Sequence, residues 1–135
     1  MPKVFVDTAA WIALLNVSDM LHNCAEQVMS KLLQQKTLLV TTEFVLLEVA
    51  DALSAPNIRV KTINFINGLR QLRILQIVPI SHDLFINGWT LYSQRSDKGW
   101  GLTDCISFVV MNQQQITTAF TSDRHFEQAG FVKLM

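Results

Sequence analysis

The 135-residue sequence is poor in charge, glycine, proline and cysteine. Only 16% of its residues are Asp, Glu, Lys or Arg, and 11 basic side chains balance 11 acidic ones, so the formal net charge is zero. This balance excludes nucleic-acid binding through a strongly basic face, although local cations remain compatible with it. At 50% hydrophobic residues the chain is too apolar to be disordered. We expect a single domain over residues 1–135.

Other motifs are missing as well. The two cysteines, Cys24 and Cys105, have no metal-site spacing and make a disulfide framework implausible. No apolar run approaches the ~20 residues that span a bilayer, and we recognise no secretory leader, so we expect a protein of the reducing cytoplasm without a membrane partner. Glycine-rich dinucleotide and P-loop motifs are absent. Asp7 also lacks the second Asp, two residues on, of an aspartate-nucleophile phosphatase.

The apolar pattern predicts strands that alternate with helices. Short apolar stretches predict four strands and a possible fifth, at residues 3–6, 37–40, 74–80, 117–121 and 131–134. Helical periodicity predicts helices over residues 9–16, 19–35, 42–53, 57–73, 82–95 and 102–112. Thr41 and Thr42 are typical helix N-caps. This alternation predicts a three-layer α/β/α sandwich around a short central parallel sheet of four to five strands.

Four acidic residues stand at informative places in this pattern. Asp7 and Asp123 each follow a predicted strand, and the carboxyl ends of parallel strands share the edge where ligands bind. Glu48 lies within an apolar helix, on or beside its buried stripe, where a carboxylate needs a partner. Asp104 lies in the first turn of a helix, where the helix dipole favours an anion. For Asp104 and Asp123, helix capping alone is the alternative.

Convergence of these carboxylates would predict a metal site. Carboxylates held close together repel one another, and one takes up a proton unless a cation neutralises them. Oxygen ligands favour Mg²⁺ or Mn²⁺, which can activate a water molecule and stabilise charge on a phosphoryl group. We therefore predict catalytic and metal-binding roles in phosphodiester hydrolysis for Asp7, Glu48, Asp104 and Asp123.

Four segments carry a family resemblance. VFVDTAAW, TTEFVLLEVADAL, WGLTDCISF and FTSDRHFEQAGF resemble the PIN domain, and most closely its VapC-type toxin branch from prokaryotic toxin–antitoxin pairs. The four acids keep the family's order, with spacings of 41, 56 and 19 residues. The resemblance implies a metal-dependent endoribonuclease that acts on single-stranded RNA, forms a homodimer and is silenced by a cognate antitoxin protein. It also implies that Thr8 and Thr121 assist the metal or its water.

Some assignments have alternatives. Lys98 and Arg124 are possible RNA contacts beside the acidic cleft, but solvated surface charges are the common case for such residues. Trp100, in a glycine-flanked loop, could stack on a base. Glu43 is a rival for Glu48, but its place in the first helical turn favours a structural role. The alternative function is a non-catalytic PIN-like module that binds RNA or a protein without cutting, and a plain α/β domain whose acids are caps is a third.

Overall fold

In the computed structural model, which describes residues 2–135, five parallel strands form one sheet in the order β3-β2-β1-β4-β5. The bounds are β1 Lys3–Val6, β2 Leu38–Thr42, β3 Leu75–Val78, β4 Thr118–Phe120 and β5 Val132–Lys133. The predicted parallel sheet is therefore confirmed, and the possible fifth strand is present as a two-residue edge strand.

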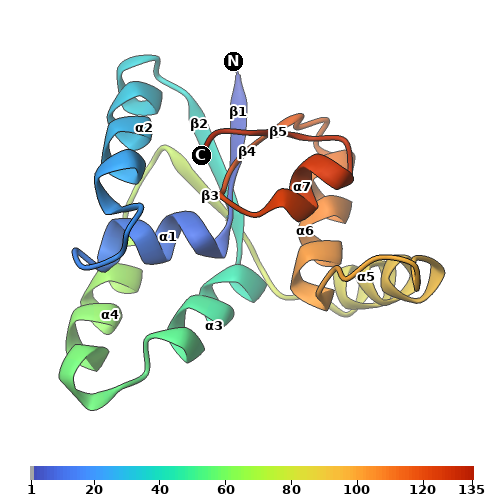
Figure 1. Ribbon diagram of the computed structural model, residues 1–135, viewed down its shortest axis with the longest axis horizontal. Helices are drawn as coiled ribbons and strands as arrows, with labels where there is room; N and C mark the ends of the chain where they lie inside the picture. The colour runs from blue at the N-terminus through green and yellow to red at the C-terminus, as the bar shows by residue number, and fades with distance from the viewer. Residues whose placement is uncertain (1) are drawn as a thin grey trace.

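Seven helices within the described chain surround the sheet: α1 Thr8–Leu15, α2 His22–Gln34, α3 Glu43–Ala52, α4 Pro56–Leu69, α5 His82–Gln94, α6 Leu102–Gln113 and α7 Arg124–Gln128. Figure 1 shows α1, α2 and α4 on one side of the sheet and α5, α6 and α7 on the other, as expected for three layers. Helix α3 packs against both α1 and α6. None of the helices described is both long and apolar enough to cross a membrane.

Several predicted boundaries shift by a few residues. The helix predicted over residues 57–73 ends at Leu69, because the backbone N–H groups of Gln71 and Leu72 bond to carbonyls three residues back, as in a turn, and no longer four residues back. β3 is shorter than predicted and ends at Val78. Thr42 is the predicted N-cap, since its hydroxyl accepts a hydrogen bond from the backbone N–H of Val45 at 3.0 Å. Thr41 instead belongs to β2.

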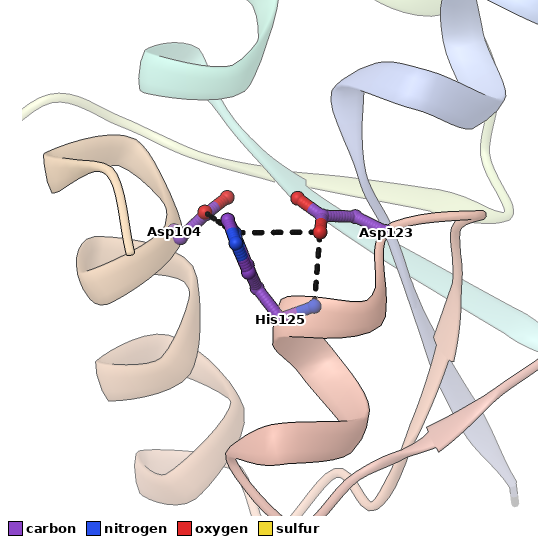
Figure 2. Close-up of side chains that lie close together, drawn as sticks. All are labelled: Asp104, Asp123 and His125. Atoms are coloured by element: carbon purple, nitrogen blue, oxygen red, sulfur yellow. Dashed lines mark hydrogen bonds and ion pairs between the residues drawn. The ribbon is translucent and has the colours of Figure 1, made fainter. Parts of the chain in front are cut away.

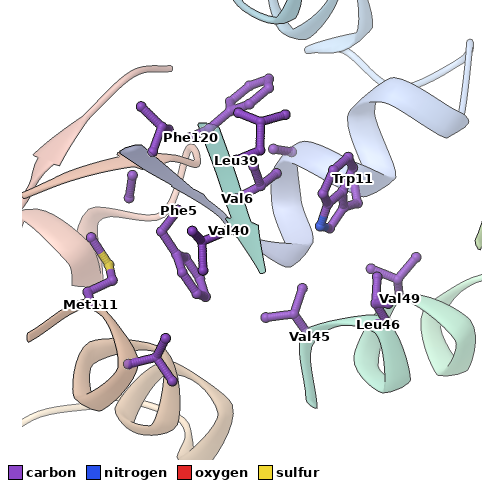
Figure 3. Close-up of a cluster of buried hydrophobic side chains, with 14 of the residues drawn as sticks. Phe5, Val6, Trp11, Leu39, Val40, Val45, Leu46, Val49, Met111 and Phe120 are labelled. Atoms are coloured by element: carbon purple, nitrogen blue, oxygen red, sulfur yellow. The ribbon is translucent and has the colours of Figure 1, made fainter. Parts of the chain in front are cut away.

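The central strand β1 is anchored on both faces. Phe5 and Val6 point to opposite faces of the sheet, and both side chains are fully buried in the core that Figure 3 shows. Beside them, the indole N–H of the buried Trp11 donates to the Thr41 hydroxyl at 3.2 Å, and that hydroxyl donates to the backbone carbonyl of Val6 at 2.8 Å. These contacts hold the carboxyl end of β1, where Asp7 follows.

The order of the strands places that end at a point where the chain changes direction. The chain runs from β1 outward through β2 to β3, and then returns to add β4 on the other side of β1. The backbone N–H of Asp7 donates to the carbonyl of Phe120 at 3.1 Å, so pairing between β1 and β4 continues to the sheet edge. In parallel α/β sheets, ligand sites form beyond the carboxyl ends of the strands at such a point.

Candidate active site

Asp7 occupies the N-cap position of α1 but its side chain does not cap the helix. Its backbone is extended, as an N-cap requires, yet the carboxylate forms no capping hydrogen bond. Instead Oδ2 accepts a hydrogen bond from the Thr121 hydroxyl, 2.9 Å away at the end of β4. The carboxylate is thus directed across the sheet edge, toward β4. A simple capping role does not account for this acid.

The Asp7 carboxylate is buried and only partly satisfied. The residue is 4% exposed, and Oδ1 has no hydrogen-bond partner among residues 2–135. The pKa of Asp7 is raised from 3.8 to about 7, chiefly by burial and in smaller part by the negative charges of Asp104 and Glu48. Two nearby donors, the Thr8 backbone N–H and the Thr121 hydroxyl, lower the pKa and offset part of this rise. The Thr8 N–H does so without a hydrogen bond of ordinary geometry. A buried, half-satisfied acid of this kind is costly without a further partner.

A second group of side chains lies beside Asp7. Asp104, in the first turn of α6, and Asp123, which precedes α7, lie on either side of the His125 imidazole (Figure 2). Nδ1 of His125 is 3.0 Å from Oδ2 of Asp104 and 3.4 Å from Oδ1 of Asp123. One potential ligand atom from each of the three residues lies within 4.8 Å of the others. Folding therefore brings together two acids that are 19 residues apart in the sequence.

Both acids also take part in local capping, as the alternative proposed. Asp123 accepts a hydrogen bond from the backbone N–H of His125 at 2.9 Å, and Asp104 accepts one from the backbone N–H of Gly101 at 3.3 Å. Capping does not satisfy the whole of either group. Burial still raises the pKa of Asp104, and the Asp123 charge adds to the rise, while the hydrogen bond from His125 lowers it.

Glu48 reaches the site from α3, but not from a buried stripe. Of the two places expected for Glu48, the buried stripe itself is wrong, because Val45, Leu46 and Val49 form that stripe and Glu48 is exposed. It lies beside the stripe, three residues after Val45. Its Oε1 nevertheless accepts a hydrogen bond from the Thr8 hydroxyl at 2.5 Å. Glu48 thus borders the site from the solvent side, where it contacts Thr8, the residue that follows Asp7.

One pattern is shared by all four carboxylates. Each has one oxygen held by a hydrogen-bond donor of the protein, from Thr121, Thr8, His125 or a backbone N–H. The second oxygen of each has no hydrogen bond within the described residues. Figure 2 shows the free oxygens of Asp104 and Asp123 turned toward each other on the side away from α7. Carboxylates with free oxygens, one of them buried, are the kind of ligand that a hard divalent cation prefers.

Two of the three predicted RNA contacts, Arg124 and Lys98, are cations in different parts of the structure. Arg124 directly follows Asp123 and is exposed, and Lys98 lines an open pocket of about 430 Å³ together with Tyr92. Neither cation forms an ion pair with another described residue. Trp100 does not fit the expectation of an exposed stacking residue, because it is 6% exposed.

The burial of Trp100 has identifiable causes. The indole N–H donates to the side chain of Gln128 at 3.0 Å, and the ring packs edge-to-face against Phe108 with centroids 5.1 Å apart. The Arg95 guanidinium lies 4.9 Å from the ring centroid. The flanking glycines suggested an exposed loop, but α6 and α7 enclose this indole.

No role was predicted for His125 from the sequence, and Glu43 was considered only as an alternative to Glu48. His125 was missed, although its position two residues after Asp123 could have indicated that it returns to the same group. Glu43, the rival for Glu48, has the structural role expected: Oε1 accepts from the backbone N–H of Ile80 at 2.8 Å, and Oε2 is 3.7 Å from Arg70. It joins α3 to the ends of α4 and β3.

Known proteins resemble the chain over almost its entire length. VapC20 of Mycobacterium tuberculosis, a 23S rRNA-specific endonuclease, is 26% identical over 141 aligned residues, which cover 97% of both chains. The crystal structure of that VapC20, a sarcin-ricin loop cleaving toxin, matches with a TM-score of 0.83 and 96% coverage of each chain. The structure of VapBC2 from Rickettsia felis, solved bound to a promoter DNA fragment, matches with a TM-score of 0.70 at 14% identity. The match covers 97% of this chain and 96% of that one, and it supports the fold alone.

The arrangement of acids at the β1–β4 edge and the likeness in fold agree with a match at the level of sequence. The profile of the PIN domain family matches residues 4–132, which is nearly the whole of the chain. The protein belongs to the PIN domain family.

Proposed function

We propose that this protein is a metal-dependent endoribonuclease that hydrolyses phosphodiester bonds in RNA, and that it is the toxin of a toxin–antitoxin module. The family membership supports a nuclease, and the similarity to VapC20 supports RNA as the substrate. The observation that carries the proposal is the buried Asp7 carboxylate, which has an unpartnered oxygen and feels the negative charges of Asp104 and Glu48. A structural role would leave that oxygen unsatisfied at a cost in stability.

Mg²⁺ or Mn²⁺ is the cofactor that these oxygen donors fit. Asp7, Asp104 and Asp123 would hold the cation through their free oxygens, with Glu48 at the solvent side. When bound, the cation would supply positive charge to stabilise the phosphoryl group and would lower the pKa of a water molecule.

The side chains of the protein have separate tasks in this scheme. The Thr121 hydroxyl holds Oδ2 of Asp7, and the Thr8 hydroxyl holds Oε1 of Glu48, so that one oxygen of each acid keeps a fixed direction. The exposed Glu48 can accept a hydrogen bond from the attacking water through Oε2, which orients that water toward the phosphorus. This scheme requires no nucleophilic side chain and no covalent intermediate with the protein.

Arg124 and Lys98 are the residues that we assign to RNA phosphate contacts. Both are cations without an ion-pair partner in residues 2–135, and Arg124 lies next to the acidic group in the chain. Charged side chains of this type bind phosphate irrespective of base identity. We do not assign base stacking to Trp100, because its ring is enclosed.

We further propose that the protein forms a homodimer in the cytoplasm and is held inactive by a cognate antitoxin protein. Exposed apolar side chains on three helices supply surface for such partners, notably Leu47, Val60, Ile63, Phe85 and Trp89. Light scattering on the purified chain should give twice the monomer mass of 15.3 kDa. A monomeric mass at micromolar concentration would contradict the dimer.

The test of the enzymatic function is cleavage of intact ribosomal RNA by the purified chain. We expect discrete fragments in the presence of Mg²⁺ or Mn²⁺, and none after addition of EDTA. Asp7→Asn and Asp104→Asn should each reduce cleavage at least 100-fold, since each removes a charge that would hold the cation. Asp83→Asn is the matched control, because Asp83 is an exposed acid on α5 without a place in the site.

Two results would contradict the enzymatic function. Undiminished cleavage by Asp7→Asn or Asp104→Asn would remove the acids from the mechanism. Saturable Mn²⁺ binding without cleavage of ribosomal, messenger or transfer RNA would favour the alternative, a non-catalytic module that binds RNA or a protein.

A further inference from the structure

The His125 imidazole lies between the carboxylates of Asp104 and Asp123 (Figure 2). Its Nδ1 is 3.0 Å from Oδ2 of Asp104 and 3.4 Å from Oδ1 of Asp123. The backbone N–H of the same residue donates to Oδ1 of Asp123 at 2.9 Å. One residue therefore contacts two acids that belong to separate helical segments.

The chemistry of the partners sets the direction of these hydrogen bonds. An ionised carboxylate offers only acceptors, so Nδ1 of His125 must carry the hydrogen atom. Nδ1–H then donates to Asp104 over the shorter distance, with Asp123 as a longer, second acceptor. Because Nδ1 is used in this way, it is not free to act as a metal ligand.

This contact continues a chain of hydrogen bonds that ends at Asp7. The backbone N–H of Asp123 donates to the Thr121 hydroxyl at 3.0 Å, and that hydroxyl donates to Asp7 at 2.9 Å. His125 adds Asp104 to the other end. The three acids are thus held relative to one another by Thr121 and His125.

We propose that His125 is a positioning residue for the cation site: its Nδ1–H fixes the carboxylates of Asp104 and Asp123 so that their free oxygens face a common divalent ion. This inference rests on the proposed function. It adds a residue that acts through the acids and does not itself touch the cation. Without this donor, two like charges from α6 and from the start of α7 would repel and turn apart.

Three variants and one binding measurement test the role. His125→Leu removes the donor and keeps apolar bulk, whereas His125→Asn retains an N–H donor on the same carbon position as Nδ1. His82→Leu is the control, since His82 is exposed at the start of α5. Mn²⁺ is titrated calorimetrically into each metal-free protein without RNA, after a thermal melt confirms that the variant is folded.

We expect His125→Leu to weaken Mn²⁺ binding about 10- to 100-fold, as removal of such a supporting hydrogen bond does at other metal sites. His125→Asn and His82→Leu should bind within about threefold of the wild type, because both keep the donor. Electron spin-echo spectra of the Mn²⁺-loaded wild type should lack the ¹⁴N coupling of a directly bound imidazole.

Several results would overturn this role, and they can be told apart from failure of the proposed function. Equal Mn²⁺ affinity of His125→Leu and the wild type, or equal losses in His125→Leu and His125→Asn, would show that the donor is not what matters. A ¹⁴N coupling would make His125 a ligand instead. Absence of Mn²⁺ binding by the wild type would instead overturn the cation site itself.

Discussion

Replacing Asp7 by Asn should make the metal-free protein more stable, although it removes a charge central to the proposed activity. The substitution keeps the shape of the side chain and an oxygen that can accept the hydrogen bond from Thr121. It removes the negative charge that burial and the neighbouring acids disfavour. A residue with a purely structural role would show the opposite result, since Asn cannot replace a required carboxylate.

The magnitude follows from the raised pKa of the carboxyl group. A pKa of about 7 in place of 3.8 corresponds to about 4 kcal/mol of lost stability near pH 7, since each pKa unit is worth about 1.4 kcal/mol. We expect the variant to recover about half of this, because the new amide N–H₂ needs an acceptor of its own. A gain of about 2 kcal/mol should raise the melting temperature of a chain of this size by about 7 °C.

The assay compares melting temperatures of the wild type, Asp7→Asn and the Asp83→Asn control, first in EDTA and then in Mn²⁺. In EDTA, Asp7→Asn should melt highest. In Mn²⁺ at about 100 times its dissociation constant the wild type should gain about 2.7 kcal/mol, while the variant gains little. When the metal is added, the two melting temperatures should therefore converge, or their order should reverse.

One pair of results would refute this reasoning. If Asp7→Asn melts below the wild type in EDTA, and if Mn²⁺ shifts both proteins equally, then the Asp7 carboxylate stabilises the fold and does not bind the cation. The Asp83→Asn control should follow the wild type in both buffers, which separates an effect of this site from a general effect of net charge.

Three further predictions address pH, the threonine support and helix packing. Because the pKa of Asp7 is raised, the folded state binds more protons than the unfolded chain between pH 4 and 7, so metal-free wild type should lose about 2 kcal/mol of stability from pH 5.5 to pH 8; a stability that rises over this range in chemical denaturation would contradict it. Thr121→Val should weaken Mn²⁺ binding in calorimetry about tenfold by freeing Oδ2 of Asp7, whereas Thr90→Val, at an exposed position of α5, should not. Gly88→Ala should destabilise the protein by about 2 kcal/mol in denaturant titration, since a Cβ there would overlap Ile106 of α6, while Gly68→Ala, which has open space, should not.

The sheet and the positions of two acids could be predicted because they depend on local pattern and one topological rule. Short apolar stretches such as Lys3–Val6 are typical of strands buried on both faces, and alternation with helices makes the sheet parallel. Once the sheet is parallel, Asp7 and Asp123 must follow strands that end at the same edge. That β1 and β4 are direct neighbours came only from the structure.

The features that escaped prediction depend on contacts between distant elements. Glu48 is exposed because its helix buries the adjacent Val45, Leu46 and Val49, and an unbroken apolar sequence does not reveal which side chains face the core. Trp100 is enclosed because Gln128 and Phe108 reach it from α7 and α6. His125 gains its partners only when α7 packs beside α6.

The energetics of the acidic group are stronger evidence for a ligand than the presence of four acids alone. Acids at helix starts are common, and two of the four here do accept capping hydrogen bonds. An ordinary cap on the surface leaves its carboxylate in contact with water, whereas Asp7 makes no capping hydrogen bond and is buried with a raised pKa and an unpaired oxygen. A buried carboxylate needs hydrogen bonds or an opposite charge to offset the loss of water. Within residues 2–135 this compensation is incomplete, because one oxygen of Asp7 has no partner. Since the neighbouring charges are themselves negative, only a cation or a proton can complete it, and the choice between them is what the Mn²⁺-dependent melting of Asp7→Asn decides.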